Sequence, residues 1–234
     1  MTWDPSILLE LFPPTPVGTG RSSMTAIDMF AGWGGFSLGA EQAGAEVLWA
    51  ANHWPLAVQA HSVNLPTAEH LCQDLRQANF HDAPDHDLLL AAPACQGHSQ
   101  ASQPKRRAYH DTLRATAWAV VSAAEAKLPE VIVVENVTDF LRWKLYPVWR
   151  EALNQLGYTL GEHHLTASHF GVPQRRKRLF IVGSRSKHPL PLRFRRSPEP
   201  GFRSCIDETA NGWRPVSEAT VGVKARVNKG RGNH

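Results

Sequence analysis

Residues 27–39 read IDMFAGWGGFSLG and combine a strand, a turn and a helix in one short stretch. The apolar residues up to Phe30 predict a buried strand, and the closely spaced glycines of GWGG predict a tight turn. A helix is predicted from Gly34 to Gln42. Glycines between a strand and a helix let the backbone approach a ligand closely, while the helix amides face that ligand. The stretch therefore predicts a nucleotide-type site, with a glycine turn needed only for packing as the alternative.

The alternation of apolar strand and helix continues along the chain. Further strands are predicted at VLWAAN, DLLLAA, VIVV, YTLGEHHLTAS and RLFIVGS. Further helices are predicted at residues 55–64, 111–127 and 145–156, and Asp111 is well placed to cap the second of these. Strands that alternate with helices predict an α/β fold with a doubly wound, mostly parallel sheet of the Rossmann-like type. Ligands of such sheets gather at the carboxyl ends of the strands.

The composition limits the class of protein. A chain of 234 residues that is 42% hydrophobic can bury the core of one globular domain. No apolar run approaches the ~20 residues of a membrane-spanning helix, and the N-terminal residues lack the basic start of a secretory signal. Cys72, Cys95 and Cys205 show no CxxC spacing, which argues against a disulfide framework and a structural zinc site. We therefore expect a reducing, cytoplasmic setting and no bound metal.

Three segments are predicted. Residues 1–23 are expected to form a loose extension, residues 24–185 the folded domain, and residues 186–234 a basic, irregular tail. The formal net charge is +4, and the excess of Lys and Arg lies in the last segment. A basic segment on a near-neutral body indicates a polyanionic partner, although a solvated surface has the same composition.

Polar side chains near the ends of the first strands are candidate ligand contacts. Asp28 can accept hydrogen bonds from a cationic or hydroxyl-bearing ligand. His53 stands where nucleotide-type sites usually carry an acid for the ribose, and Trp54 after it can stack on an adenine. Asp74 can accept a hydrogen bond from an amine. A buried structural Trp and a surface Asp are the alternatives for the last two.

Two later strands end in residues that can carry chemistry. Cys95 lies in PACQGHS, where a turn beyond a strand can make a thiol exposed and nucleophilic, although a lone cysteine is more often buried and inert. Glu135 ends the apolar run of VIVVENV, where desolvation raises the carboxyl pKa. Asn136 can fix that carboxyl or bind the edge of a planar ring.

The run QRRKR, residues 174–178, leads into the last predicted strand. Alternation along a strand places Arg176 and Arg178 on the same side. Two guanidinium groups on one side suit a carbonyl oxygen, a carboxylate or a phosphate. A solvated basic turn is the alternative.

In this order and spacing, DMFAGWGGFSLG, NHW, PACQGHS, ENV and QRRKR resemble the cytosine-5 DNA methyltransferases. The resemblance runs from about Thr25 to Ser184. It implies the sheet of the S-adenosylmethionine-dependent methyltransferases and methylation of cytosine carbon 5 in double-stranded DNA, typical of restriction-modification. The cofactor residues implied are Asp28, Phe30, Gly32, Trp33, Gly35, His53, Trp54, Asp74 and Pro93, with His53 in place of the family's acidic ribose ligand.

The same resemblance implies the catalytic and DNA-binding residues. Cys95 matches the nucleophile, Glu135 the acid at the cytosine ring with Asn136 beside it, and Arg178, with Arg176 behind it, the arginine at the substrate oxygen. The implied DNA contacts are Gln96, Ser99, Lys105, Arg106, Arg107 and Gln174. A flipped base would be covered by the polar segment 96–110.

The residue types suit that chemistry. A thiolate is the side chain best able to attack cytosine carbon 6, and an acid of raised pKa can protonate ring nitrogen 3 as electrons move into the ring. Carbon 5 then takes the methyl group, a base removes its proton, and the thiol leaves. The base must leave the duplex for any of these steps.

Two departures from the family affect this interpretation. Ala94 stands where the family commonly has proline, which lies one place earlier at Pro93. The family's target-recognition region and two further motifs have no counterpart before His234. We therefore expect the catalytic part of a bacterial or phage-encoded methyltransferase, either a split subunit or a truncated form that needs a second polypeptide. The alternatives are a non-catalytic module that binds S-adenosylmethionine or DNA, and a Rossmann oxidoreductase, which GxGG in place of GxGxxG disfavours.

Overall fold

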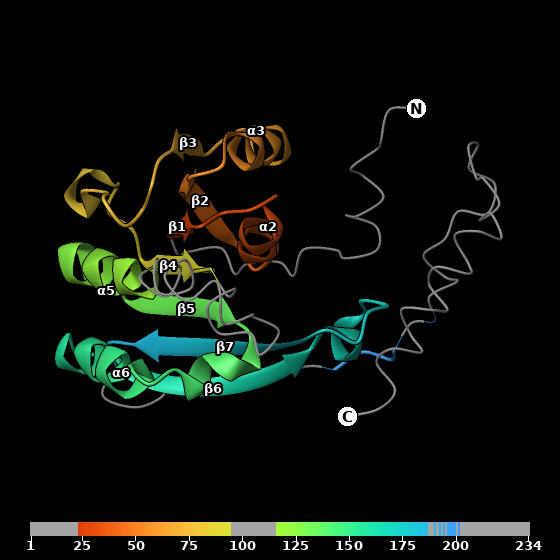
Figure 1. Ribbon diagram of the computed structural model, residues 1–234. Helices are drawn as coiled ribbons and strands as arrows, with labels where there is room; N and C mark the ends of the chain where they lie inside the picture. Colours follow the sequence, from red (N-terminus) through yellow and green to blue (C-terminus); the bar gives the residue numbers. More distant parts are fainter. Residues whose placement is uncertain are drawn as a thin grey trace, which may run out of the picture.

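The computed structural model describes residues 23–94 and 116–186, together with residues 190, 192, 194, 196–199 and 201. In this part of the chain, seven strands form one sheet (Figure 1). The strands are β1 (Met24–Met29), β2 (Ala45–Asn52), β3 (Glu69–Cys72), β4 (Leu88–Ala91), β5 (Val131–Asn136), β6 (Thr159–Thr166) and β7 (Lys177–Ser184). The helices are α2 (Gly35–Gln42), α3 (Pro55–Asn64), α5 (Thr116–Lys127) and α6 (Tyr146–Gln155), with short 3-10 turns η1 (Phe80–Asp82), η3 (Thr138–Arg142) and η4 (Ala167–Phe170).

The strand order is β3-β2-β1-β4-β5-β7-β6. Strands β3, β2, β1, β4 and β5 pair in parallel, whereas β7 pairs antiparallel with β5 and with β6. The predicted doubly wound, mostly parallel sheet is confirmed. Because the five parallel strands run in one direction, their carboxyl ends and the loops after them meet at one edge, which we call the carboxyl edge.

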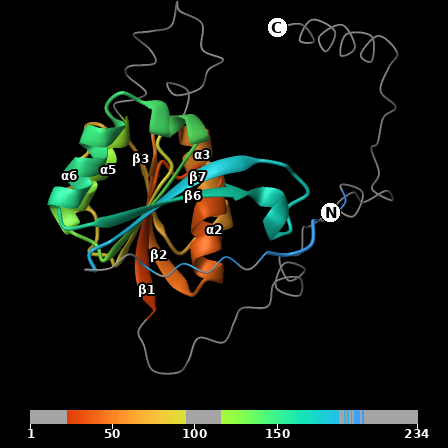
Figure 2. The same ribbon diagram turned by 90° about the horizontal axis from the view of Figure 1, so that it is seen from below.

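Helices cover both faces of the sheet. Seen along the sheet, α5 and α6 lie on one side, and α2 and α3 lie on the other (Figure 2). The larger hydrophobic core lies under α5 and α6, where the Trp149 indole of α6 is fully buried and donates to the Ala117 carbonyl of α5 at 2.8 Å. A smaller core lies under α2, built from Ala26, Val47 and Leu90 with Ala40 of the helix. The alternating side chains of each strand thus face two apolar layers.

Most predicted boundaries agree with the structure to within two residues, but two details differ. The strand predicted at VIVV continues through Glu135 and Asn136, which pair with Phe180 and Leu179 of β7. These two residues therefore belong to the sheet and do not follow it. The predicted cap at Asp111 lies outside the described residues.

No helix in the described part of the chain is both long and apolar enough to cross a membrane.

Candidate active site

The glycine-rich loop follows β1 at the carboxyl edge and is closed on one side only. Phe30 begins it with a φ of 61° and Gly34 ends it with a φ of 99°, both in the left-handed region. A Cβ at Gly34 would lie 2.6 Å from Leu65 Cδ1, so the loop packs tightly against the end of α3. A Cβ at Gly32 or Gly35 would meet nothing within 4 Å. The open side of the loop is therefore available to a ligand, as the sequence predicted.

Hydrogen bonds join this loop to the end of β2. The Ala31 amide donates to the Ala51 carbonyl at 3.0 Å, and Asn52 Nδ2 donates to the Ala31 carbonyl at 2.8 Å. From the end of α3, Asn64 Nδ2 donates to the Trp33 carbonyl at 2.7 Å. The glycine loop, the end of β2 and α3 thus form one hydrogen-bonded unit.

Two tryptophans project from this unit. Trp33 is 62% exposed and Trp54 is 48% exposed, and their rings meet edge to face with centroids 6.4 Å apart. Two neighbouring exposed rings offer an apolar surface on which a planar ligand can stack. The alternative of a buried structural Trp54 is wrong.

His53 and Asp74 both lie at this edge. His53 is exposed, and its carbonyl accepts a hydrogen bond from Cys72 Sγ at 3.8 Å. Asp74 is paired with Arg76, whose Nε lies 2.9 Å from Asp74 Oδ1. Hydrogen bonds from Arg76 lower the pKa of the Asp74 carboxyl to about 2. Asp74 is therefore an ionised acceptor that already has a cationic partner, which the sequence analysis missed although DLR carries the two residues at close spacing.

Asp28 lies beneath the loop and not on its open side. Its side chain is 1% exposed, and Oδ2 accepts a hydrogen bond from Ser37 Oγ at 2.6 Å. Oδ1 has no hydrogen-bond partner among the described residues. Burial raises the pKa of Asp28 to about 7, against the opposing effect of the Ser37 hydrogen bonds. The predicted acceptor is thus present, but an internal hydroxyl already occupies one of its oxygens.

The chain leading to Cys95 is fixed from two sides. The Pro93 carbonyl accepts a hydrogen bond from Asn136 Nδ2 of β5 at 3.2 Å, and the Ala94 amide donates to Thr116 Oγ1 of α5 at 3.1 Å. Asn136 Oδ1 accepts from the Val137 amide at 2.8 Å. Asn136 therefore holds the strand end before Cys95, and the suggestion that it fixes the Glu135 carboxyl is wrong.

Glu135 and Arg178 form an ion pair beside this anchor, with Arg178 Nε 2.9 Å from Glu135 Oε1. The two residues lie diagonally across the β5–β7 pair, because Glu135 is opposite Phe180. Burial raises the pKa of the Glu135 carboxyl above its ordinary value, while the charges of Arg178 and Arg176 oppose that rise. The predicted direction of the shift is confirmed, and both arginines act on the carboxyl.

Residues 174–176 of the basic run are more exposed to solvent than Arg178. Arg176 lies just before β7, where its amide donates to the Gln174 carbonyl at 2.8 Å and its carbonyl accepts from Ala167. Arg175 reaches Glu199 at 3.8 Å. Gln174 and Arg176 are exposed, so both remain available to a ligand.

Several predicted residues lie outside the described part of the chain. They are Cys95 and the predicted DNA contacts Gln96, Ser99, Lys105, Arg106 and Arg107. Their assignments stay predictions.

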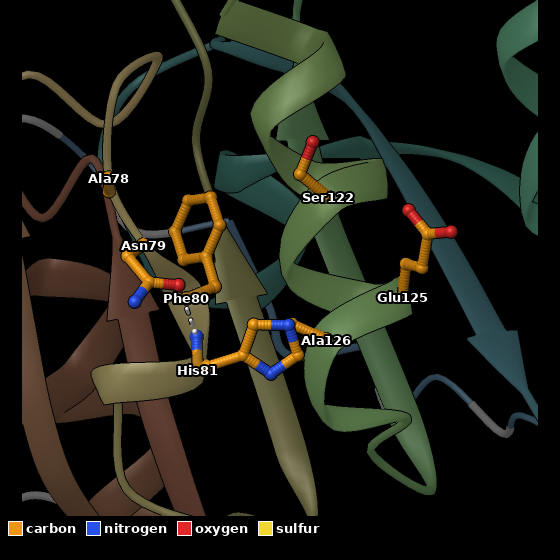
Figure 3. A pocket seen from close by; sticks show the side chains of 7 residues that line it. All are labelled: Ala78, Asn79, Phe80, His81, Ser122, Glu125 and Ala126. Atoms are coloured by element: carbon orange, nitrogen blue, oxygen red, sulfur yellow. Dashed lines mark hydrogen bonds between the residues drawn. The ribbon is translucent and has the colours of Figure 1, made fainter.

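A separate pocket of about 350 Å³ lies between η1 and the second half of α5 (Figure 3). Its polar lining residues include Asn79, His81, Ser122 and Glu125. None of the predicted site residues lines it, so it is distinct from the site at the carboxyl edge. Within the described ranges, no group of three or more His, Cys, Asp or Glu side chains is arranged to hold a metal ion.

A doubly wound sheet with a glycine loop at its carboxyl edge is a Rossmann-like architecture, and it is shared by solved methyltransferase structures. Among solved structures, the methyltransferase EhMeth of Entamoeba histolytica matches with a TM-score of 0.67 and 17% identity, over 82% of this chain and 62% of that one. At this identity the match supports the fold alone.

Comparison of sequences gives the family. The model of the C-5 cytosine-specific DNA methylases matches residues 24–219, so the chain belongs to this family. The Type II methyltransferase M.NlaX of Neisseria lactamica is 35% identical over 204 residues, covering 85% of this chain and 63% of that protein. M.HaeII of Haemophilus aegyptius is 34% identical over 160 residues, covering 67% of this chain and 49% of that protein. The matched parts of the chain thus span 49% and 63% of these two relatives' length.

Proposed function

We propose that this chain is the catalytic part of a DNA (cytosine-5) methyltransferase, which transfers a methyl group from S-adenosylmethionine to carbon 5 of cytosine through a covalent bond to Cys95. The observation that carries the proposal is the anchor at Pro93 and Ala94. Pro93 accepts a hydrogen bond from Asn136, the residue that follows Glu135 in β5, and Glu135 pairs with Arg178 at the same sheet edge as the glycine loop, which supports a position of Cys95 near this pair. A nucleophile, an acid and a cofactor loop would then meet at one place.

The residues of the loop suit S-adenosylmethionine. The open faces of Gly32 and Gly35 leave room for close approach, and the exposed rings of Trp33 and Trp54 offer a surface for an adenine. Asp28 Oδ1 lies buried beneath the loop without a hydrogen-bond partner among the described residues, and the carboxyl would carry negative charge when a cationic cofactor binds above it. The bound cofactor would supply an electrophilic methyl group on a positively charged sulfur.

The proposed steps follow from the charges of Glu135 and Arg178. The Cys95 thiolate attacks cytosine carbon 6, and electrons move towards ring nitrogen 3. Arg178 Nε occupies Oε1 of Glu135, which leaves Oε2 to carry the proton for that nitrogen. The raised pKa of Glu135 favours the protonated acid needed for this step. Arg178 stays beside the ring as a donor to the cytosine oxygen.

DNA contact is proposed for the basic run and for the segment after Cys95. Gln174 and Arg176 are exposed, and the charge of Arg176 acts on the Glu135 carboxyl of the Glu135–Arg178 pair. Lys105, Arg106 and Arg107 would contact phosphates of double-stranded DNA while the target base is flipped out of the duplex.

Transfer of labelled methyl from S-adenosylmethionine to DNA tests the proposal. The chain is assayed alone and with a polypeptide that supplies the remaining region of its relatives, the partner predicted from the sequence. We expect Cys95→Ser to abolish transfer. Cys72→Ser is the matched control, because Cys72 is an exposed free thiol outside the proposed chemistry. Failure of both arms to label DNA of varied sequence contradicts the enzymatic function and leaves a binding module.

A further inference from the structure

Four side chains form a continuous hydrogen-bonded chain from beneath the glycine loop to the edge of the sheet. Ser37 Oγ lies 2.6 Å from Asp28 Oδ2 and 3.0 Å from His61 Nε2. His61 Nδ1 lies 2.8 Å from His70 Nε2. Asp28, Ser37 and His61 are each at most 1% exposed, whereas His70 is half-buried on the edge strand β3. The chain therefore connects a buried carboxyl to solvent.

The four hydrogen-bonded side chains come from four elements around the glycine loop. Asp28 lies on β1, Ser37 in the first turn of α2, His61 on α3 and His70 on β3. The loop touches it directly, because a Cβ at Gly34 would lie 3.5 Å from His61 Cδ2. A change in the protonation of these hydrogen-bonded side chains would therefore alter the contacts of the glycine loop.

The donors and acceptors of these hydrogen bonds can be arranged in two ways. In each arrangement, every hydrogen bond has one donor and one acceptor. With Asp28 ionised, His70 Nε2–H donates to His61 Nδ1, His61 Nε2–H donates to Ser37 Oγ, and the Ser37 hydroxyl donates to Asp28. With Asp28 protonated, Asp28 donates to Ser37, Ser37 donates to His61 Nε2, and His61 Nδ1–H donates to His70 Nε2. The second state contains one proton more than the first. The two imidazoles are neutral in both, and each carries its proton on the opposite nitrogen.

We propose that Ser37, His61 and His70 are positioning residues that carry one proton between Asp28 and solvent when a cationic cofactor binds at the glycine loop. The proposal rests on the proposed function for the identity of the cofactor. A positive charge above the loop favours the ionised carboxylate below it. The Asp28 proton then passes to Ser37 Oγ, the Ser37 proton to His61 Nε2, and the His61 Nδ1 proton to His70 Nε2. His70 releases its Nδ1 proton to water, so one proton leaves and no other bond changes.

No other buried titratable side chain of these described strands and helices lies among the four hydrogen-bonded residues. Asp28 is flanked on the neighbouring strands by Ala50 of β2 and Leu90 of β4, which are apolar and buried. The other titratable side chains of these strands and helices are exposed, namely Glu41, Glu46, Glu69 and Cys72. Burial raises the pKa of Asp28 to about 7, and burial together with His70 lowers the pKa of His61 to about 4. Asp28 would therefore titrate near neutral pH while His61 stays neutral.

The proposed proton relay, which consists of Asp28, Ser37, His61 and His70, is tested first without cofactor. Ring ¹⁵N shifts of His61 and His70 are measured between pH 5 and pH 9, a range that brackets the Asp28 pKa of about 7. We expect the His61 proton to move from Nε2 to Nδ1 as the pH falls through that value. Asp28→Asn should leave a single His61 tautomer throughout the range, because the amide does not titrate and cannot exchange the proton that reverses the hydrogen bonds. One unchanged tautomer across the range in the natural chain overturns the relay.

The second test is calorimetric binding of S-adenosylmethionine and of S-adenosylhomocysteine, which lacks the sulfonium charge, in two buffers of different ionisation enthalpy. At pH 7 the cationic ligand should release about half a proton more than the neutral one, and its Kd should rise about tenfold from pH 8 to pH 6. Asp28→Asn should abolish both effects, because the amide does not titrate, whereas His81→Gln, an exposed histidine on η1, should keep them.

The two failures are distinguishable. Binding of both ligands with equal proton release overturns the relay and leaves the proposed function standing. Absence of binding contradicts the proposed function, and the tautomer measurement on the free chain then decides the relay alone.

Discussion

Replacement of Gly34 by Ala should destabilise the protein because two costs fall on one residue. The φ of 99° lies in the left-handed region, which costs an L-residue about 1–2 kcal/mol. The new Cβ would lie 2.6 Å from Leu65 Cδ1, and Leu65 is buried, so overpacking adds about 1–3 kcal/mol. We expect the free energy of unfolding to fall by about 2–5 kcal/mol in urea or guanidinium titrations.

Gly32→Ala is the matched control, because its Cβ meets nothing within 4 Å and its φ is not positive. This variant should unfold within about 0.5 kcal/mol of the natural chain, yet bind S-adenosylmethionine more weakly if the cofactor lies on the open face of the loop. The steric cost can be isolated with Leu65→Ala, since the double variant should recover about 1–3 kcal/mol relative to the sum of the single ones. Equal stability of Gly34→Ala and Gly32→Ala would refute the described loop conformation.

Three further variants probe the contacts around the site. Trp149→Phe should lower the free energy of unfolding by about 1–3 kcal/mol in denaturant titrations, because the buried Ala117 carbonyl loses its donor; stability equal to that of the natural chain would show that the bond is absent. Asn136→Ala should lower stability by a similar ~1–3 kcal/mol through the loss of the Pro93 bond, and it should slow methyl transfer while cofactor binding, followed by calorimetry, stays unchanged. Arg76→Ala should cost at most about 1 kcal/mol near pH 6, since the pair with Asp74 is partly exposed. The Asp74 pKa is lowered to about 2 from 3.8, so the pair stabilises the fold above pH 4 and is lost as pH falls towards 2, where the two chains should unfold alike.

Local sequence patterns predicted the fold well, because apolar runs and glycine turns act within a few neighbouring residues. VIVV and RLFIVGS each predicted a strand, and both are present in β5 and β7. The antiparallel insertion of β7 between β5 and β6 was not predicted, because pairing direction depends on residues distant in sequence. The left-handed Phe30 was missed for a related reason, since tertiary contacts hold a bulky residue there against its own preference.

The sequence predicted which residues belong to the candidate site better than it predicted which residues they contact. The raised pKa of Glu135 followed from the four apolar residues before it, whereas its Arg178 partner comes from another strand. His61 and His70 gave no signal, because a histidine on a helix face and one on a short strand show no distinctive spacing. Their link to Asp28 exists only because α3 and β3 pack beside β1 and β2. The second polypeptide, the DNA contacts after Cys95 and the predicted segment boundaries stay predictions.

The central claim is that Cys95 forms a covalent bond to cytosine carbon 6. The most direct measurement is mass spectrometry of the chain after incubation with S-adenosylmethionine and DNA containing 5-fluorocytosine, in the presence of a polypeptide that supplies the remaining region of its relatives. The fluorine blocks the final proton removal and traps the adduct. The account predicts one DNA adduct, on the peptide that contains Cys95, which is lost in Cys95→Ser and kept in Cys72→Ser. An adduct on another residue, or methyl transfer to ordinary DNA without any adduct on the fluorinated DNA, would contradict it.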